Sequence, residues 1–267
     1  RTFIPEDIPM GESWSLAMVG YRYIFHGKAA HAAAAPEEGI NALNAANLAM
    51  QAIALQRETF RDEDHIRVHP IITRGGAAVS SVPANVTMEM FIRAASIEAM
   101  KDAEQKVDQA LRAGAMAIGA TVEISTSPGY MPSKFDPVLS DIYDENVRSL
   151  LGESATGRVP HRTSSTDMGD VSALVPTMQS YAGGASGRTH SDEFEITDWE
   201  LDVVEAGKAL ASTVISLLSD SAALGQGLVD DFEASLTIPE YLATLREFRR
   251  VEIFESDHRV AEQITGF

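Results

Sequence analysis

The chain has 267 residues, of which 45% are hydrophobic, so it can bury one large core or two modest ones, which argues against global disorder. Thirty-nine acidic residues against 21 basic residues give a formal net charge of -18, which opposes binding to nucleic acid and to anionic membranes. Without cysteine, only His and carboxylate side chains are available as metal ligands. We find neither a long apolar run nor a basic-then-apolar leader, so we expect no membrane partner and a cytoplasmic location.

Residues 18–130 show the alternation of strands and helices that is typical of one compact domain. Runs rich in aromatic and β-branched residues predict strands, and apolar residues at helical spacing predict helices. The expected strands cover 21–25, 66–73, 86–94 and 121–127, and the expected helices cover 40–58 and 97–118. The order βαββαβ predicts a ferredoxin-like domain, with a four-stranded antiparallel sheet and two helices on one face.

The rest of the chain contains helices but few strands. Residues 135–152 and 197–220 have helical periodicity, 153–170 are expected to form a loop, and 171–184 include a short apolar strand. Helices with an apolar face need a partner layer. We therefore expect this part to pack against a sheet made elsewhere in the protein.

The segment FHGKAAHAAAAPEEGINAL places His31 between a strand and a helix, among small residues that allow another surface to approach closely. A lone His in such a loop is more often structural or solvated. The segment resembles the aminoacylase, carboxypeptidase G and p-aminobenzoyl-glutamate hydrolase family of dinuclear metallohydrolases, whose lid domain opens with this pattern. The residues that match are Gly27, His31, Pro36, Gly39, Asn41, Ala42 and Leu43. The resemblance implies that His31 is catalytic and stabilises the oxyanion in the partner subunit's active site.

The segment ITRGGAAVSSVPANVTMEMFIRA is similar to a second part of the same lid, in which a Gly pair leads to an Asn, a Pro and a strand ending in Arg-Ala. Ser80 stands where the family usually has Asn, and it can still donate a hydrogen bond, although with shorter reach. The resemblance implies that Ser80 and Arg93 bind substrate. For Arg93, an ion pair at the end of a strand is an equally good interpretation.

The segment HRTSSTDMGDVSALVPTMQSYAGGASGRTHSDEF resembles the p-aminobenzoyl-glutamate hydrolase branch of the family in particular. The resemblance implies that His190 binds one of two metal ions, a role that suits a neutral imidazole. It also implies that Asp167 and Gly183 line the substrate site. Asp167 and Asp170 are equally well explained as caps of a following turn, and a loop residue such as His161 is more often solvated.

Two other patterns imitate catalytic motifs. His65 and His69 have the spacing of a helical zinc pair, but they lack the adjacent Glu and lie in a β-rich run. Glu37 and Glu38 are not the Glu pair that the family uses in catalysis, because that pair precedes the lid. We assign no site to these residues.

The resemblance covers about residues 15–220 and implies an α/β fold (an α+β lid) that combines a ferredoxin-like lid with part of an α/β metallohydrolase catalytic domain. The expected segments are a linker from a missing catalytic segment at 1–17, the lid and dimerisation domain at 18–130, the C-terminal part of the catalytic domain at 131–227, and a helical tail at 228–267.

The implied function is a metal-dependent amidohydrolase that uses water activated by two zinc or manganese ions. Its substrate would be a small N-acyl or aroyl amino acid similar to p-aminobenzoyl-glutamate, and it would form a homodimer through the lid. The bridging Asp, the catalytic Glu and the other metal ligands have no matching positions, so we expect them in an upstream segment. Two alternatives remain: a truncated chain that serves only as a dimerisation or binding module, and a deacetylase or dipeptidase on the same scaffold.

Overall fold

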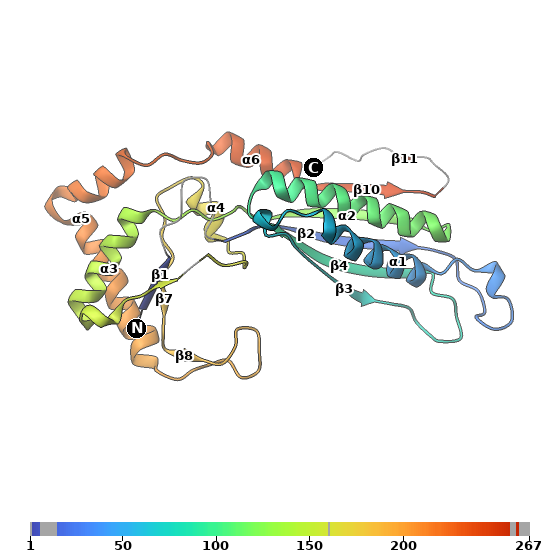
Figure 1. Ribbon diagram of the computed structural model, residues 1–267, viewed down its shortest axis with the longest axis horizontal. Coiled ribbons are helices and arrows are strands. Elements are labelled where there is room, and N and C mark those ends of the chain that lie inside the picture. The colour runs from blue at the N-terminus through green and yellow to red at the C-terminus, as the bar shows by residue number, and fades with distance from the viewer. Residues whose placement is uncertain (1, 6–14, 160, 257–259, 262–267) are drawn as a thin grey trace. The chain divides into compact units, whose positions relative to one another are not determined.

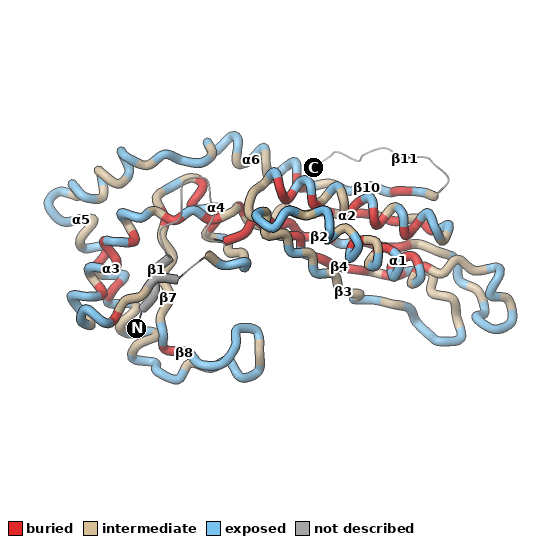
Figure 2. Tube along the Cα trace, in the orientation of Figure 1, coloured by how far each residue is buried: buried red, intermediate tan, exposed pale blue. Residues whose placement is uncertain are grey.

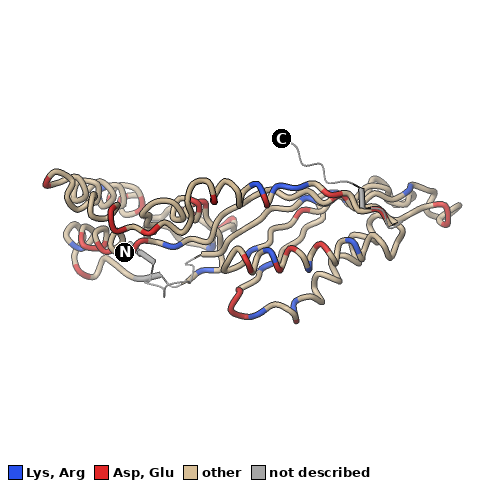
Figure 3. The backbone as a smooth tube through the Cα atoms, turned by 90° about the horizontal axis from the view of Figure 1, so that it is seen from above, with Lys and Arg blue, Asp and Glu red and all other residues tan. Residues whose placement is uncertain are grey.

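The computed structural model describes residues 2–5, 15–159, 161–256 and 260–261, which form two compact units (Figure 1). The sheet unit comprises Leu16–Pro132 and Pro239–Phe267, and the helical unit comprises Arg1–Ser15 and Ser133–Ile238. Acidic residues are spread over both units (Figure 3). Among the described residues, no helix is both long and apolar enough to cross a bilayer.

The sheet unit is built on one antiparallel sheet with the strand order β11-β10-β5-β2-β4-β3. The strands are β2 (Ala17–His26), β3 (Arg67–Arg74), β4 (Asn85–Ala94), β5 (Thr121–Tyr130), β10 (Arg250–Phe254) and β11 (Val260–Ala261). Helices α1 (Ala42–Leu55) and α2 (Ile97–Ile118) cover one face, and short 3-10 helices lie at Pro36–Glu38, Gln56–Thr59 and Asp62–Asp64. The structure confirms the mixed α/β class and the predicted βαββαβ order.

The core of this unit lies between the sheet and the two helices (Figure 2). In β4, residues Val86, Met88, Met90 and Ile92 are buried, while the residues between them are exposed or half-buried. This follows from the two-residue period of a strand. Burying a side chain of this size contributes about 1.5–3 kcal/mol, so the alternating pattern determines which face the helices cover.

The ends of both helices are specified locally. The Asn41 side chain accepts hydrogen bonds from the backbone N–H groups of Leu43 and Asn44 at 2.9 and 3.1 Å, which caps α1. The Ser96 hydroxyl caps α2 in the same way, and Gly119 ends α2 in the left-handed region at φ 74°. These caps explain why the predicted helices appear where the sequence indicated.

The C-terminal segment differs from the expected helical tail. It begins with helix α6 (Ile238–Glu247), but it continues as strand β10, which pairs with β5. Strand β11 then pairs with β10. The segment therefore extends the sheet of the sheet unit.

The helical unit has short strands and longer helices. The helices are α3 (Pro137–Leu151), α4 (Met168–Ser172), a π-helical turn at Glu200–Glu205 and α5 (Ala206–Asp230), with a 3-10 turn at Glu153–Ala155. The strands are β1 (Thr2–Pro5), β6 (Arg158–Val159), β7 (Tyr181–Ala182), β8 (Ala185–Ser186) and β9 (Glu195–Ile196). Part of the expected N-terminal linker is thus a strand, because β1 pairs with β6 and β7; residues 6–14 lie outside the described residues.

The core of the helical unit is small. It consists of Tyr143, Val147, Ala155 and Ala209 with two partly buried neighbours. Several large apolar side chains on α5 remain exposed, namely Leu210, Val214, Ile215 and Leu218. The same helix is interrupted at residues 219–222, where three residues adopt positive φ angles. The described strands of this unit are only two to four residues long.

Candidate functional site

The loop that carries His31 is paired along its length with the loop that carries Ser80. Gly27 donates a backbone hydrogen bond to Ala84 at 2.8 Å, and Ala32 donates one to Ser80 at 2.9 Å. His31 and Ser81 form a β-bridge. Two of the sequence motifs are therefore brought together at the end of the sheet where β2 ends and β4 begins.

Gly27 is required by a close backbone approach. A Cβ atom at this position would lie 2.1 Å from the carbonyl oxygen of Ile40. The same strand end is fixed by reciprocal backbone hydrogen bonds between Lys28 and Ile40, both 2.9 Å long. A residue without a side chain is therefore needed for the loop to turn toward His31.

The His31 ring is oriented by its own loop. Its Nδ1 atom accepts hydrogen bonds from the backbone N–H groups of Ala33 and Ala34 at 3.2 and 3.1 Å. A neutral imidazole that accepts at Nδ1 carries its proton on Nε2. His31 is exposed, so its loop presents an Nε2–H donor to the surroundings.

Arg93 lies at the opposite end of the same sheet. It pairs with Met18 of β2, whereas Asn85, at the other end of β4, pairs with His26. These two pairs are eight residue steps apart along β4, which corresponds to roughly 26 Å. One small substrate cannot contact both Arg93 and His31 of a single subunit.

The surroundings of Arg93 favour an anion. Arg67 of β3 lies directly opposite Arg93 on the exposed face of the sheet, and like charges in this position repel each other. The Arg93 guanidinium lies 5.3 Å from the centre of the Phe91 ring, and burial lowers its pKa. Phe91 also lines a groove of about 480 Å³ with Gly20 and His69. Arg67 could not be found from the motifs, because its position opposite Arg93 depends on the strand register.

His190 lies in the turn between β8 and β9 in the helical unit. It is exposed and has a positive φ of 64°, and the preceding Gly187 also has a positive φ of 81°. A Cβ atom on Gly187 would lie 2.1 Å from the carbonyl oxygen of Glu193. The tight hairpin therefore holds His190 at its tip. Gly183 is exposed between β7 and β8.

Asp167 stands at the start of α4, where the sequence suggested a cap. Its side chain makes no capping hydrogen bond, and one of its oxygens accepts a hydrogen bond from the Thr166 hydroxyl at 3.3 Å. Asp167 is exposed. Asp170 lies within α4, and its backbone N–H donates to the carbonyl of Asp167 at 3.0 Å.

The positions of the described His, Asp and Glu side chains limit the metal site that this chain can form. Among the residues that the structure describes, no three His, Asp or Glu side chains are grouped so that they could hold a metal ion. His65 follows a 3-10 helix and His69 lies on β3, so these two do not form a helical pair. The described residues therefore do not fit a complete metal centre, and His190 can supply only one ligand.

Comparison with known proteins agrees with the fold and the motifs. Residues 17–117 match the peptidase dimerisation domain family. The chain is 31% identical to the Xaa-Arg dipeptidase of Mus musculus and 29% identical to that of Homo sapiens, over 82% of this chain and 52% and 51% of those proteins. This confirms the resemblance seen in the sequence. Residues 17–117 therefore form a domain of the peptidase dimerisation family.

The chain spans about half the length of the curated relatives it matches. Its fold is shared by a dinuclear metal-binding peptidase of the M20 family from Bacillus subtilis, with a TM-score of 0.54 and 17% identity. That match covers 81% of this chain and 53% of the other.

Proposed function

We propose that this chain provides the dimerisation domain and the second part of the catalytic domain of a metal-dependent amidohydrolase, which cleaves the amide bond of an N-acyl or aroyl amino acid. The observation that carries the proposal is the orientation of His31, whose Nδ1 accepts two backbone hydrogen bonds and whose Nε2–H is exposed. A fixed donor of this kind stabilises the oxyanion that forms when water attacks an amide carbonyl.

His31 acts in the active site of a second subunit. The separation of roughly 26 Å between the His31 and Arg93 ends of the sheet supports this arrangement. If Arg93 binds the substrate carboxylate in one active site, the donor that reaches the scissile carbonyl must come from another copy of the chain. Ser80, held beside His31 by the backbone bond between its carbonyl and Ala32, would approach the same substrate.

A homodimer through the sheet unit meets this requirement. Of the two edges of the sheet, β3 presents eight residues without a neighbouring strand in the described structure. Unpaired N–H and C=O groups along such an edge favour pairing with another chain. We expect a dimer in gel filtration at micromolar concentration, and a monomer would contradict this arrangement.

The substrate has a carboxylate, and Arg93 is its binding partner. Arg67 beside it favours a second negative charge, as in an acyl-glutamate of the p-aminobenzoyl-glutamate type. Asp167 and Gly183, both in the helical unit, are further proposed substrate-binding residues. The second candidate substrate is a dipeptide with a C-terminal Arg, because two relatives that are similar in sequence are named Xaa-Arg dipeptidases.

The metal ions belong to the complete catalytic domain. We propose that they are zinc or manganese and that His190 contributes one ligand, while the other ligands come from the part of the domain outside this chain. When bound, such ions activate the attacking water. A purified chain of this length that binds two tight equivalents of either metal would contradict this assignment of ligands.

The experiment that tests the function uses the protein with its complete catalytic domain. Hydrolysis of p-aminobenzoyl-glutamate and of a matched peptide with a C-terminal Arg is measured before and after His31→Ala. Loss of one oxyanion donor should lower turnover by about 10²–10³-fold, with the metal content unchanged. Lys28→Ala, at an exposed position of the same loop, is the control and should change turnover little. Unchanged turnover in the His31 variant would refute the proposed role. Hydrolysis of neither substrate would favour the alternative of a dimerisation or binding module.

A further inference from the structure

The β5 edge of the sheet, opposite to β3, is occupied by the chain's own C-terminal segment. Five residues of β10 pair with β5 in antiparallel register, from Arg250 opposite Thr126 to Phe254 opposite Val122. Strand β11 then folds back on β10. Residues 239–254 thus join a sheet whose other strands come from residues 17–130, far away in sequence.

Apolar and backbone contacts anchor this segment. Phe248 and Phe254 belong to the core of the sheet unit and are only 4% and 9% exposed. The Thr126 hydroxyl donates to the carbonyl of Phe248 at 2.7 Å and accepts from the backbone N–H of Arg250 at 3.2 Å. The segment therefore enters the sheet at a defined register.

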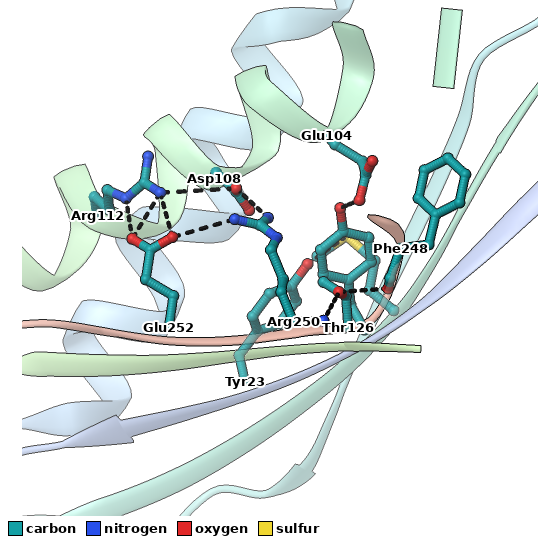
Figure 4. Close-up of polar contacts among 10 residues, drawn as sticks. Tyr23, Glu104, Asp108, Arg112, Thr126, Phe248, Arg250 and Glu252 are labelled. Atoms are coloured by element: carbon teal, nitrogen blue, oxygen red, sulfur yellow. Dashed lines mark hydrogen bonds and ion pairs between the residues drawn. The ribbon is translucent and has the colours of Figure 1, made fainter. Parts of the chain in front are cut away.

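A cluster of charged side chains holds the strand against α2 (Figure 4). Glu252 binds the guanidinium of Arg112 through both of its oxygens at 2.7–2.9 Å. Arg250 donates to Glu252 at 3.1 Å and forms an ion pair with Asp108, which is 4% exposed. Removing one partner of such a buried ion pair strongly destabilises the protein, because the other charge is left buried without a partner.

The orientation of β10 shows that this contact is specific. Arg250 and Glu252 point toward α2, whereas Val251 and Ile253 are exposed, at 41% and 36%. Phe254 is the one apolar residue of β10 on the inward face, where Arg250 and Glu252 also lie. The charged cluster and Phe254 together favour this face of β10 turning inward.

Without this segment, the sheet would expose two long edges, the ten residues of β5 and the eight residues of β3. A subunit with two open sheet edges can pair with neighbours on both sides, which produces open-ended assemblies rather than a closed dimer. The C-terminal segment replaces the long β5 edge with a five-residue strand and a two-residue return strand. Short, charged edge strands resist such pairing.

We propose that residues 239–254 are a built-in cap of the β5 edge, which leaves β3 as the edge for a second copy of the chain and limits assembly to a dimer. This inference rests on the proposed dimer. If the cap is released, the partner that fits the β5 edge is the β3 edge or the β5 edge of another copy.

The test compares Glu252→Arg with Val251→Arg in the full chain. The first places a cation beside Arg112 and Arg250, whereas the second adds the same side chain on the exposed face of the same strand. Light scattering after gel filtration gives the mass of the assembly, and hydrogen exchange with mass spectrometry reports the protection of the β5 amides.

We expect Glu252→Arg to lower the protection of the β5 amides by roughly tenfold or more and to produce assemblies larger than the wild type. Val251→Arg should keep the wild-type mass and protection. The cap is refuted if Glu252→Arg leaves β5 protected, if it exposes β5 without larger assemblies, or if Val251→Arg behaves identically. A wild-type mass of one chain would contradict the proposed dimer, while the exchange data would still show separately whether β10 is held on β5.

Discussion

Replacement of Gly27 by Ala tests whether the loop that presents His31 depends on one close backbone contact. The added Cβ atom would lie 2.1 Å from the carbonyl oxygen of Ile40, and real Cβ atoms essentially never come within 3.0 Å of such an atom. The backbone must therefore move by about 1 Å. Such overpacking costs about 1–3 kcal/mol. Loss of the two hydrogen bonds between Lys28 and Ile40 adds roughly 1 kcal/mol each.

The assay is denaturant unfolding together with turnover in the protein that has a complete catalytic domain. Gly75→Ala is the matched control, because its Cβ would meet its nearest neighbours at ordinary distances of 3.6 and 3.8 Å. We expect Gly27→Ala to lose stability by about 3–5 kcal/mol and to lose turnover as His31 shifts. A Gly27 variant that matches the Gly75 variant in both measurements would refute the reasoning.

Three further predictions concern stability. Gly207→Ala should raise the free energy of unfolding by about 0.5–1 kcal/mol, because the added methyl meets nothing within 4 Å in helix α5; denaturant unfolding checks this, and a loss of stability would contradict it. Gly114→Leu should lower the melting temperature of the sheet unit, because the Cβ atom of the new side chain alone would lie 2.5 Å from the carbonyl oxygen of Ala45. An unchanged melting temperature would refute the close packing of α1 and α2. Burial is the largest cause of the raised pKa of Glu104. The Glu104 side chain therefore contributes stability in its protonated form, which is fully present below the pKa of the unfolded chain and is lost as pH rises through the pKa of the folded protein. Relative to Glu104→Gln, the wild type should therefore gain thermal stability between about pH 7 and pH 4.5, and a constant difference would contradict the shift.

The sheet unit was largely predictable because local and tertiary signals agree. Apolar residues at every second position of β4 are buried, and Asn41 and Ser96 cap the helices that the spacing predicts. Strand β10 was missed because most of its pattern is inverted: Arg250 and Glu252 face α2 and Val251 and Ile253 face outward, and only Phe254 is an apolar residue facing inward. The positions of Asp108 and Arg112 in three dimensions make that orientation favourable for the two charged residues.

The candidate site was predictable in part. The motifs indicated His31, Ser80 and Arg93, and the structure places the first two together because their loops exchange backbone hydrogen bonds. The distance from Arg93 follows from antiparallel register, which the motifs alone do not specify. The partners of His190 could not be predicted, because the described residues contain no group that completes a metal site.

The central claim is that His31 of one subunit serves the active site of the other. Mixing His31→Ala with His190→Ala in proteins with the complete catalytic domain tests it directly. Each variant alone should be inactive, because every site then lacks one of the two residues. After subunit exchange, half of the dimers are mixed and each has one intact site, so about a quarter of wild-type activity should return. If no activity returns although mass spectrometry shows that mixed dimers have formed, His31 acts within its own subunit and the account is wrong.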